Sequence, residues 1–234
     1  VKRKIWFKNK EVSLNKTVEE YNAGEDILYD QEMIPDDVWC SRCYARLLER
    51  HDLITKDELA QLEQGLDEIL ELYEKGEFQL KVEDEDCHTK IEDYLIERLG
   101  DTGKKIHTGR SRNDQVLVMM RWFLKRKSKS IQEQTLKLAE KCVEFAKKHE
   151  MVAMPGYTHM QKAMPTTVGS WIMAFTESLV DDAKLLIAIN DQIVDQNPLG
   201  SGAGYGSPFD FDRDWLSKEI GFKKTQNNVI YCHN

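Results

Sequence analysis

Residues 114–149 read DQVLVMMRWFLKRKSKSIQEQTLKLAEKCVEFAKKH and contain neither glycine nor proline. The run predicts one long helix. A second run with helical periodicity, from about Thr166 to Asp195, predicts another. At roughly 1.5 Å per residue, each helix would be ~45 Å long. Because helices of that length normally pack side by side, the sequence predicts part of a helical bundle.

Each long helix carries an apolar stripe that needs a covering surface. On the second helix the stripe predicts core residues: Val168, Trp171, Ile172, Phe175, Leu179, Leu186 and Ile193. The basic run 125–129 on the first helix lacks interleaved aromatic residues, so it predicts a solvated face. Two such helices without bundle partners would expose a large apolar surface. We therefore expect the chain to be oligomeric, aggregated or poorly soluble unless something covers that surface.

The part of the chain before residue 110 predicts shorter helices. Residues 1–34 are polar and irregular, and Pro35 fits the first turn of a helix that runs to about His51. Thr55 and Glu58 form a capping box that begins the next helix, which Gly76 ends.

A further helix is expected from about Cys87 to Leu99, and residues 101–113 are expected to form a loop. After the long helices, a glycine-rich turn at 198–204 precedes a short helix near 213–220. No segment alternates with a period of two, so the fold class is predicted to be all-α. The predicted domains are a small N-terminal helical domain, 1–110, and a partial central helical bundle, 111–234.

Composition excludes several classes of function. Lys and Arg number 33 against 41 Asp and Glu, and the net charge of −8 offers no general attraction to nucleic acid or to anionic lipid. No apolar run approaches the roughly 20 residues that span a bilayer. The basic N-terminus has no apolar signal core after it, so a cytoplasmic protein is expected.

The five cysteines are an odd number, and their spacing is not that of a disulfide framework. We therefore expect free thiols. Cys40 and Cys43 have the spacing of half a zinc site, but no second pair with suitable spacing follows. Cys87 and His88 could be the other half, but both pairs are predicted on helices, so no metal site is expected. A redox motif would need a βαβ context, which is absent.

Residues 104–115 read KKIHTGRSRNDQ and bring four basic side chains, a histidine and several hydroxyl and amide groups into one predicted loop. Gly109 permits a close backbone approach, and the loop leads into a helix N-terminus. Arginine and free helical N–H groups together favour a carboxylate ligand. The alternative is a solvated loop whose Ser, Asn and Asp side chains cap the helix.

Residues 154–161 read MPGYTHMQ and place His159 between two hydrogen-bonding side chains, Thr158 and Gln161. Histidine is the side chain best suited to proton transfer near neutral pH. The alternative is a structural histidine in an ordinary loop.

Four segments together resemble argininosuccinate lyases, in the fumarase/aspartase superfamily. Residues 107–116, HTGRSRNDQV, match the hallmark of these enzymes, and residues 155–161 resemble a second loop of the family. Residues 85–92, EDCHTKIE, resemble its E-D-V-H-x-x-I-E stretch, and residues 197–203 match its P-L-G-S-G-A turn.

The resemblance implies a homotetramer with active sites built from loops of three subunits. It implies that the substrate argininosuccinate is cleaved to arginine and fumarate, with no metal or organic cofactor. His159 would be the proton-transfer group. Ser111, Arg112, Asn113 and Thr158 would hold the carboxylates of the substrate, and His88 would lie nearby.

The chain also departs from the family pattern. The flexible G-S-S-x-M-P-x-K-x-N loop, which supplies a catalytic serine and a substrate-binding lysine, is absent, so we expect these residues alone to lack lyase activity. Cys40 and Tyr44 replace the Gly and His of a G-S-x-A-H segment, and Ile27 stands where Arg is common. Two alternatives remain: a sister lyase for adenylosuccinate, aspartate or malate, and a non-catalytic helical scaffold.

Overall fold

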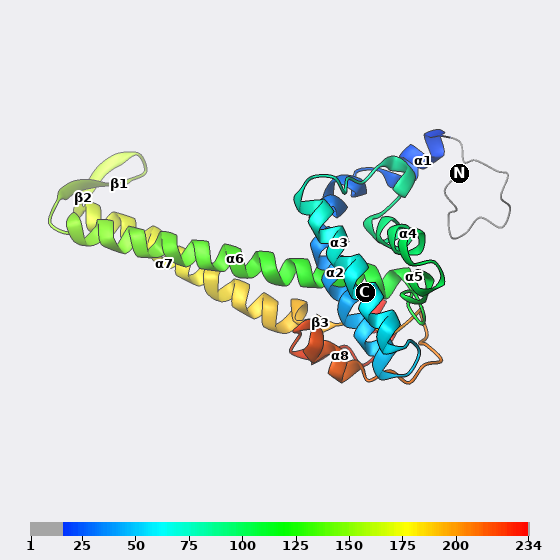
Figure 1. Cartoon of the computed structure of the whole chain (residues 1–234). Helices are drawn as coiled ribbons and strands as arrows, with labels where there is room; N and C mark the ends of the chain where they lie inside the picture. The colour runs from blue at the N-terminus through cyan, green and yellow to red at the C-terminus, as the bar shows by residue number, and fades with distance from the viewer. Residues whose placement is uncertain (1–15, 234) are drawn as a thin grey trace. The chain divides into compact units, whose positions relative to one another are not determined.

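The computed structural model describes residues 16–233, which are mostly helical, as expected (Figure 1). The α-helices are α1 (Lys16–Ala23), α2 (Asp26–Arg50), α3 (Lys56–Glu74), α4 (Cys87–Leu99), α5 (Asp101–Lys105), α6 (Arg112–Lys148), α7 (Val168–Ile189) and α8 (Arg213–Ile220). Short 3-10 turns are η1 (Val82–Asp84) and η3 (Tyr231–His233), and η2 (Asn190–Val194) is a π-helical turn that extends α7. The strands are β1 (Ala153–Thr158), β2 (Gln161–Thr167), β3 (Gln196–Asn197) and β4 (Lys224–Thr225).

The chain divides into two compact units. The first contains residues up to Phe123 together with Gln196 onward, and the second contains Leu124–Asp195. The long helix α6 therefore begins in one unit and ends in the other. These units reflect contacts within a single chain, and the expected boundary near residue 110 stays a prediction.

The first unit is organised around the buried face of α2. Ile34, Val38, Tyr44 and Leu48 on this helix are fully buried and pack with apolar side chains of α3, α4 and α8. Trp39 stacks on Trp122, with 6.4 Å between ring centroids, and its indole donates a hydrogen bond to the backbone of α8. Burial of one face of each helix therefore assembles this unit, as amphipathic helices require.

Helix boundaries that depend on local signals are confirmed. Thr55 accepts a hydrogen bond from the backbone of Glu58, whose side chain accepts one from the backbone of Thr55. Gly76 and Gly100 follow their helices with positive φ angles of 73° and 62°. The helix α8 occupies the expected residues and ends at Gly221, whose φ is 108°.

The expectation of an irregular chain before Pro35 is wrong within the described residues. The helix α1 begins at Lys16, and α2 begins at Asp26 and contains Pro35 in its interior. An interior proline costs roughly 3 kcal/mol because one backbone hydrogen bond is lost. The continuous buried face of α2 outweighs that cost. Residues 1–15 lie outside the described part.

The region expected to be a loop, 101–113, contains the short helix α5. Gly103 lies inside it and lets α5 approach the end of α4. A Cβ at Gly103 would lie 2.2 Å from the carbonyl oxygen of Leu95. Because that oxygen belongs to the backbone, it cannot move aside cheaply.

Gly103→Ala should therefore destabilise the protein by about 3 kcal/mol, as overpacking against backbone does. Gly65→Ala is a matched control, since its Cβ would meet only the side-chain ends of Leu95 and Leu99. A flexible side chain can yield, and alanine favours the helix by up to ~1 kcal/mol. Urea unfolding followed by circular dichroism measures both variants, and equal losses would contradict the backbone argument.

The second unit is a hairpin of the rest of α6, the β1–β2 ribbon and α7. The two strands pair antiparallel, so the expectation that residues 154–157 form a loop and that no strand exists is wrong. Pro155 lies opposite Pro165, and the register is irregular between Pro155 and Tyr157. Proline has no backbone N–H to donate to a neighbouring strand, so it is rare inside a β-sheet. The two prolines therefore make this strand pair hard to predict from the sequence.

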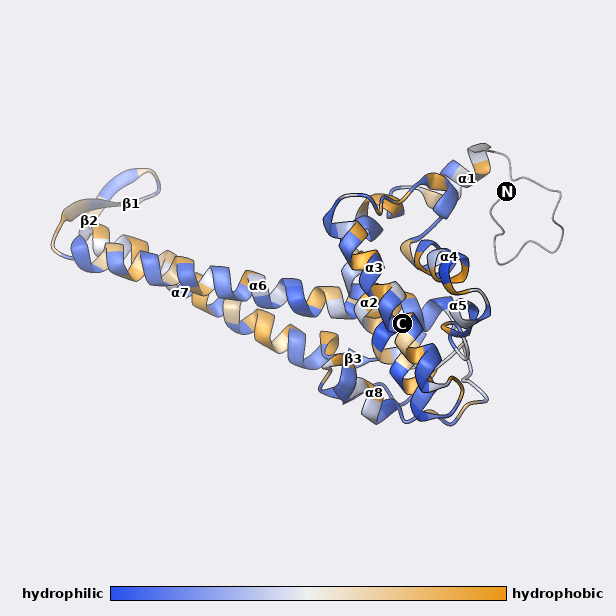
Figure 2. Cartoon of the chain, viewed as in Figure 1, coloured by the Kyte–Doolittle hydropathy of each residue, from blue (hydrophilic) through white to orange (hydrophobic). Residues whose placement is uncertain are grey.

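Small residues, not the expected stripe, form the buried seam of this hairpin. Gly169, Thr176 and Ala183 are the buried residues of α7, and a Cβ at Gly169 would lie 2.7 Å from the carbonyl oxygen of Ala146 on α6. Trp171 and Phe175 are 50% and 51% exposed, so their assignment to the core is wrong for the single chain. Figure 2 shows hydrophobic residues, in orange, along α7.

Polar contacts join the two sides of the hairpin at the end opposite the β1–β2 ribbon. Ser128 of α6 donates a hydrogen bond to Asn190 over 2.7 Å, and Lys125 pairs with Asp195 at the same distance. None of the helices within residues 16–233 has the combined length and apolarity needed to cross a bilayer.

Candidate functional site

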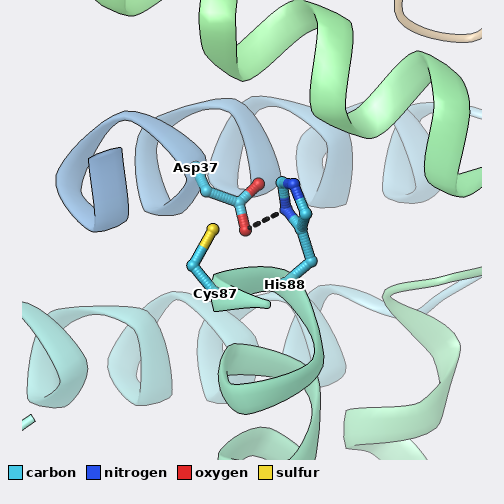
Figure 3. Close-up of side chains that lie close together, drawn as sticks. All are labelled: Asp37, Cys87 and His88. Carbon is cyan, nitrogen blue, oxygen red and sulfur yellow. Dashed lines mark ion pairs between the residues drawn. The ribbon is translucent and has the colours of Figure 1, made fainter. Parts of the chain in front are cut away.

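His88 lies in the first turn of α4 and is only 1% exposed. Its Nδ1 is 2.9 Å from Oδ2 of Asp37, a fully buried residue of α2 (Figure 3). Burial by itself would raise the pKa of Asp37, but the charges of His88 and Arg110 together bring that pKa below its usual value. The pair therefore ties α2 to α4, and the expected contact of His88 with substrate stays a prediction.

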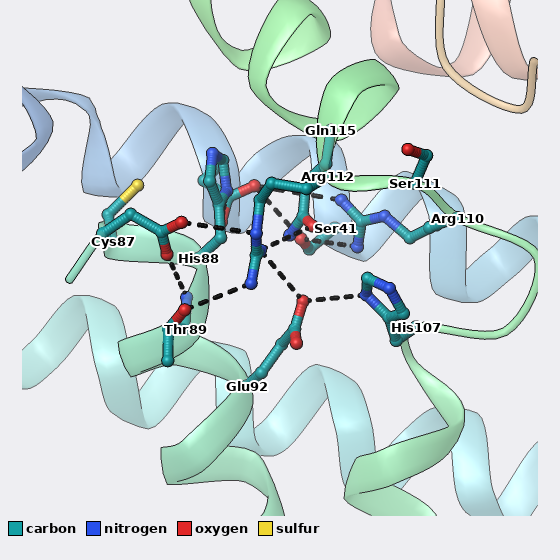
Figure 4. A network of polar contacts seen from close by, with 12 residues as sticks. Ser41, Cys87, His88, Thr89, Glu92, His107, Arg110, Ser111, Arg112 and Gln115 are labelled. Carbon is teal, nitrogen blue, oxygen red and sulfur yellow. Dashed lines mark hydrogen bonds and ion pairs between the residues drawn. The ribbon is translucent and has the colours of Figure 1, made fainter. Parts of the chain in front are cut away.

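Arg112 begins α6 and is held by acceptors from α4 (Figure 4). Its Nε lies 3.3 Å from Asp86, and its Nη2 donates to Thr89 over 3.1 Å. Its Nη1 donates to Glu92 over 3.3 Å and to Gln115 over 2.8 Å. The side chain of Arg112 is therefore fixed by one ion pair and three hydrogen bonds.

Glu92 joins Arg112 to His107. The same oxygen, Oε1, lies 3.0 Å from Nδ1 of His107 and 3.3 Å from Nη1 of Arg112. Burial would raise the pKa of Glu92, but the hydrogen bond from His107 and the charge of Arg112 outweigh it, so the pKa is lowered. The carboxylate is therefore ionised at neutral pH and fixes both neighbours.

Glu92→Gln should lower the free energy of unfolding at pH 7 by about 1–3 kcal/mol, because Arg112 and His107 lose an ionised acceptor. Since folding lowers the pKa of Glu92, its contribution is present above its ordinary pKa of 4.5 and is lost as the pH falls through the lowered value. Denaturant unfolding at several pH values should show the difference in unfolding free energy between wild type and variant shrinking as the pH falls below 4.5. A difference of constant size would contradict the assignment.

Arg110 belongs to the 107–115 loop, and its side chain is buried. Its guanidinium is 4.9 Å from the centre of the Tyr44 ring, and its Nη1 donates to Ser41 over 3.1 Å. The Tyr44 hydroxyl in turn donates to the carbonyl of Thr108 over 2.7 Å. Tyr44, which replaces a family histidine, thus stabilises the 107–115 loop through its ring and its hydroxyl group.

Gly109 allows the loop to pass two aromatic rings. Its φ is 74°, and a Cβ there would lie 2.9 Å from atoms of both Phe209 and Phe211. These two rings stack on each other with 5.2 Å between centroids. The expected close backbone approach at Gly109 is confirmed, and the partner is a pair of phenylalanines.

Asp114 fastens the loop to the glycine-rich turn. Its Oδ1 accepts from the backbone N–H of Ser111 over 2.9 Å, and its Oδ2 accepts from Gly200 over 3.1 Å and from Gly202 over 3.0 Å. Asp114 is fully buried, and burial raises its pKa against the effect of these hydrogen bonds and of Arg110. The turn at 198–204 is thereby held beside the start of α6.

Ser111 and Asn113 are the more accessible members of the loop. Asn113 is exposed and Ser111 is partly exposed, and the Ser111 hydroxyl accepts from the Asn113 backbone over 3.3 Å. Both lie where the positive end of the α6 dipole favours an anion. These two side chains can therefore donate to a carboxylate that reaches the loop.

Thr158 and His159 lie in the second unit, at the tip of the β1–β2 ribbon, and both are exposed. His159 and Met160 form the two-residue turn, with φ angles of 47° and 59°. Positive φ at both positions is the requirement of a type I′ hairpin turn. The turn leaves the His159 side chain exposed to solvent in the single chain.

The structure brings Ser111, Arg112 and His88 into one polar network and adds Asp37, Glu92 and Asp114, which the sequence analysis did not assign. Glu92 could have been found, because it lies four residues after His88 and shares a helix face with it. Asp37 and Asp114 gave no such signal, since only burial distinguishes them from solvated carboxylates.

Comparison with known proteins places these features in context. Residues 9–231 match a family model described as Lyase. Argininosuccinate lyase of Thermotoga neapolitana is 43% identical over 231 residues, which are 99% of this chain and 57% of that protein. Argininosuccinate lyase of Bacteroides fragilis is 42% identical over 230 residues, 98% of this chain and 51% of that protein. The chain thus spans about half the length of these curated relatives.

Solved structures agree with the fold. A variant of EDDS lyase with bound fumarate superposes with a TM-score of 0.78 at 25% identity, over 95% of this chain and 44% of that one. The fumarate lyase:delta crystallin of Brucella melitensis superposes with a TM-score of 0.73 at 17% identity, over 95% of this chain and 52% of that one. The second likeness concerns the fold alone.

Proposed function

The chain belongs to the lyase family whose model matches residues 9–231, and from that premise we propose that it forms part of an argininosuccinate lyase. The enzyme would carry out a carbon–nitrogen β-elimination that converts argininosuccinate to L-arginine and fumarate, as a step of arginine biosynthesis. The observation that carries the proposal is the 43% identity to a protein of that name over 99% of this chain. The cytoplasmic location expected from the sequence stays a prediction.

The residues suit this chemistry. In the elimination a base removes a proton from the carbon beside a carboxylate, and negative charge builds on that carboxylate. A second group protonates the guanidine nitrogen as the C–N bond breaks. Donors that are fixed in advance stabilise the developing charge best. We assign one of the two proton transfers to His159 and the carboxylate contacts to Ser111, Arg112, Asn113 and Thr158.

Arg112 would act mainly through its fixed charge. One ion pair and three hydrogen bonds hold its guanidinium in place, so it offers a fixed positive potential. Ser111 and Asn113 would make the direct contacts, because they are the accessible donors of the loop. His88 would support the site through Asp37, from which its Nδ1 lies 2.9 Å.

We also propose that the second unit packs in a homotetramer. Its large apolar side chains are exposed in the single chain, among them Leu124, Ile131, Leu138, Phe145, Trp171, Phe175 and Leu185. Surfaces of this kind mark contacts between protein chains. Analytical ultracentrifugation should find an oligomer, and a stable monomer would count against the bundle.

A chimera tests the proposed activity. This chain replaces the matched part of the Thermotoga neapolitana enzyme, and the remainder of that enzyme follows it. Fumarate release from argininosuccinate is expected from the chimera and not from the 234-residue chain alone. Release only from adenylosuccinate or aspartate would identify a sister lyase, and release from none of them by a folded chimera would favour the scaffold.

A further inference from the structure

Three different kinds of metal-binding side chain meet between α2 and α4 (Figure 3). They are the carboxylate of Asp37, the thiol of Cys87 and the imidazole of His88. One ligand atom from each lies within 4.8 Å of the other two, and all three residues are buried. Asp37 comes from α2, while Cys87 and His88 are the first residues of α4.

The thiol of Cys87 contacts the sulfur of Met119 over 3.5 Å, whereas the hydrogen bonding of the carboxylate and the imidazole is incomplete. Asp37 Oδ2 and His88 Nδ1 lie 2.9 Å apart, the distance of an ion pair, yet neither has a hydrogen-bond partner among residues 16–233. Two atoms can lie this close without a hydrogen bond when the ring N–H does not point at the carboxylate oxygen. Nε2 of the same ring is also buried without a partner in that part of the chain. Buried polar atoms are rarely left unpaired, so a missing ligand is indicated.

The first turn of α4 is held firmly in place. The backbone N–H of Cys87 donates to Asp30 over 3.0 Å, and Asp86 caps the helix by accepting from Thr89 over 2.6 Å. Cys87 and His88 are therefore presented to Asp37 by a fixed backbone. Such support of ligands by surrounding hydrogen bonds is typical of protein metal sites.

We propose that Asp37, Cys87 and His88 form a binding site for one divalent cation of the zinc class, Zn²⁺ or Co²⁺. Sulfur, nitrogen and oxygen ligands together are the set that Zn²⁺ accepts, at about 2.0–2.3 Å. Ligand atoms around a tetrahedral ion lie roughly 3.5 Å apart. On binding, the carboxylate of Asp37 and the ring of His88, now 2.9 Å apart, therefore separate slightly, and the thiol of Cys87 adjusts within the 4.8 Å that contains the three ligand atoms. The cation joins α2 to α4, and the site does not depend on the proposed lyase activity.

The charges balance on binding. A cysteine ligates a cation as its thiolate, so the thiol of Cys87 gives up its proton on binding. A bound cation displaces that proton to solvent, and thiolate and carboxylate together neutralise its two charges. Arg110 does not occupy the site, because its Nη2 lies 3.9 Å from the other oxygen of Asp37, Oδ1.

The chain itself offers a matched control. Cys87 stands where the resembled motif has valine, so Cys87→Val removes the thiol while the packing is kept. Cys142 is a half-exposed cysteine in the second unit, and Cys142→Val tests for unspecific thiol binding. Cys87→Ser is the second test variant, in case valine disturbs the fold, since serine keeps the size and gives up the thiolate.

The experiment uses the reduced 234-residue chain, freed of metal by chelation. After dialysis against Zn²⁺, we expect about one equivalent bound and a thermal midpoint raised by about 5 °C. Co²⁺ should give a sulfur-to-metal absorption band. Cys142→Val should keep these properties, and both Cys87 variants, shown folded by circular dichroism, should lose them. A wild-type chain without stoichiometric metal, or equal binding by a folded Cys87 variant, would overturn the proposal.

Discussion

Replacing Asp114 with alanine should lower the free energy of unfolding by about 3–5 kcal/mol, the largest loss expected from any single carboxylate in the first unit. Its two oxygens accept from three backbone N–H groups, those of Ser111, Gly200 and Gly202. Alanine leaves these buried donors without an acceptor and withdraws a negative charge near Arg110. The turn at 198–204 should then separate from the start of α6.

Asp114→Asn separates the two causes. Asparagine keeps one acceptor oxygen, but its NH2 group must face N–H donors, so we expect a smaller loss than with alanine. Asp181→Ala is the control, because Asp181 makes only an exposed pair with Lys184 and should change stability by less than about 0.5 kcal/mol. Denaturant unfolding and hydrogen exchange at Gly200 and Gly202 measure the effects. An Asp114→Ala loss as small as the control would refute the three-bond account.

His159→Asn should lower kcat of the chimera about 10²- to 10⁴-fold, with little change in KM. Histidine is the side-chain type best suited to proton transfer near neutral pH, whereas asparagine fills a similar volume and cannot transfer the proton. Activity within about threefold of wild type would remove His159 from the mechanism.

Asparagine is chosen so that a loss of kcat does not come from a change in the fold of the turn. His159 has a φ of 47°, in the left-handed region that asparagine adopts more readily than most residues. The variant should therefore fold as well as wild type, with an unchanged melting temperature. Met160→Leu is the matched control, because Met160 is 96% exposed in the same turn and should leave kcat nearly unchanged.

Much of the fold could be predicted because it depends on contacts close in sequence. The capping box of Thr55 and Glu58, the positive φ of Gly76 and the bounds of α8 each require only neighbours within a few residues. Helical periodicity likewise located α4, α6 and α7 to within a few residues. The loop that carries Ser111, Arg112 and Asn113 was found for the same reason, since its donors are consecutive.

The features that sequence reasoning missed depend on distant partners. The helix α2 continues through Pro35 because α3, α4 and α8 cover its other face, and the ribbon at 153–167 forms although its paired prolines conceal it. On α7, contact with α6 buries the small residues and leaves Trp171 and Phe175 exposed.

The sequence by itself determined where helices begin and end and which loops carry polar donors, because hydrogen bonds between near neighbours set both. Only the tertiary structure decided which charges are buried together. Asp37 meets His88 across 51 positions and Asp114 meets Gly200 across 86, and no local pattern encodes such pairs. Their physical cause is desolvation: a carboxylate is distinctive only once packing has removed its water and left specific donors in its place.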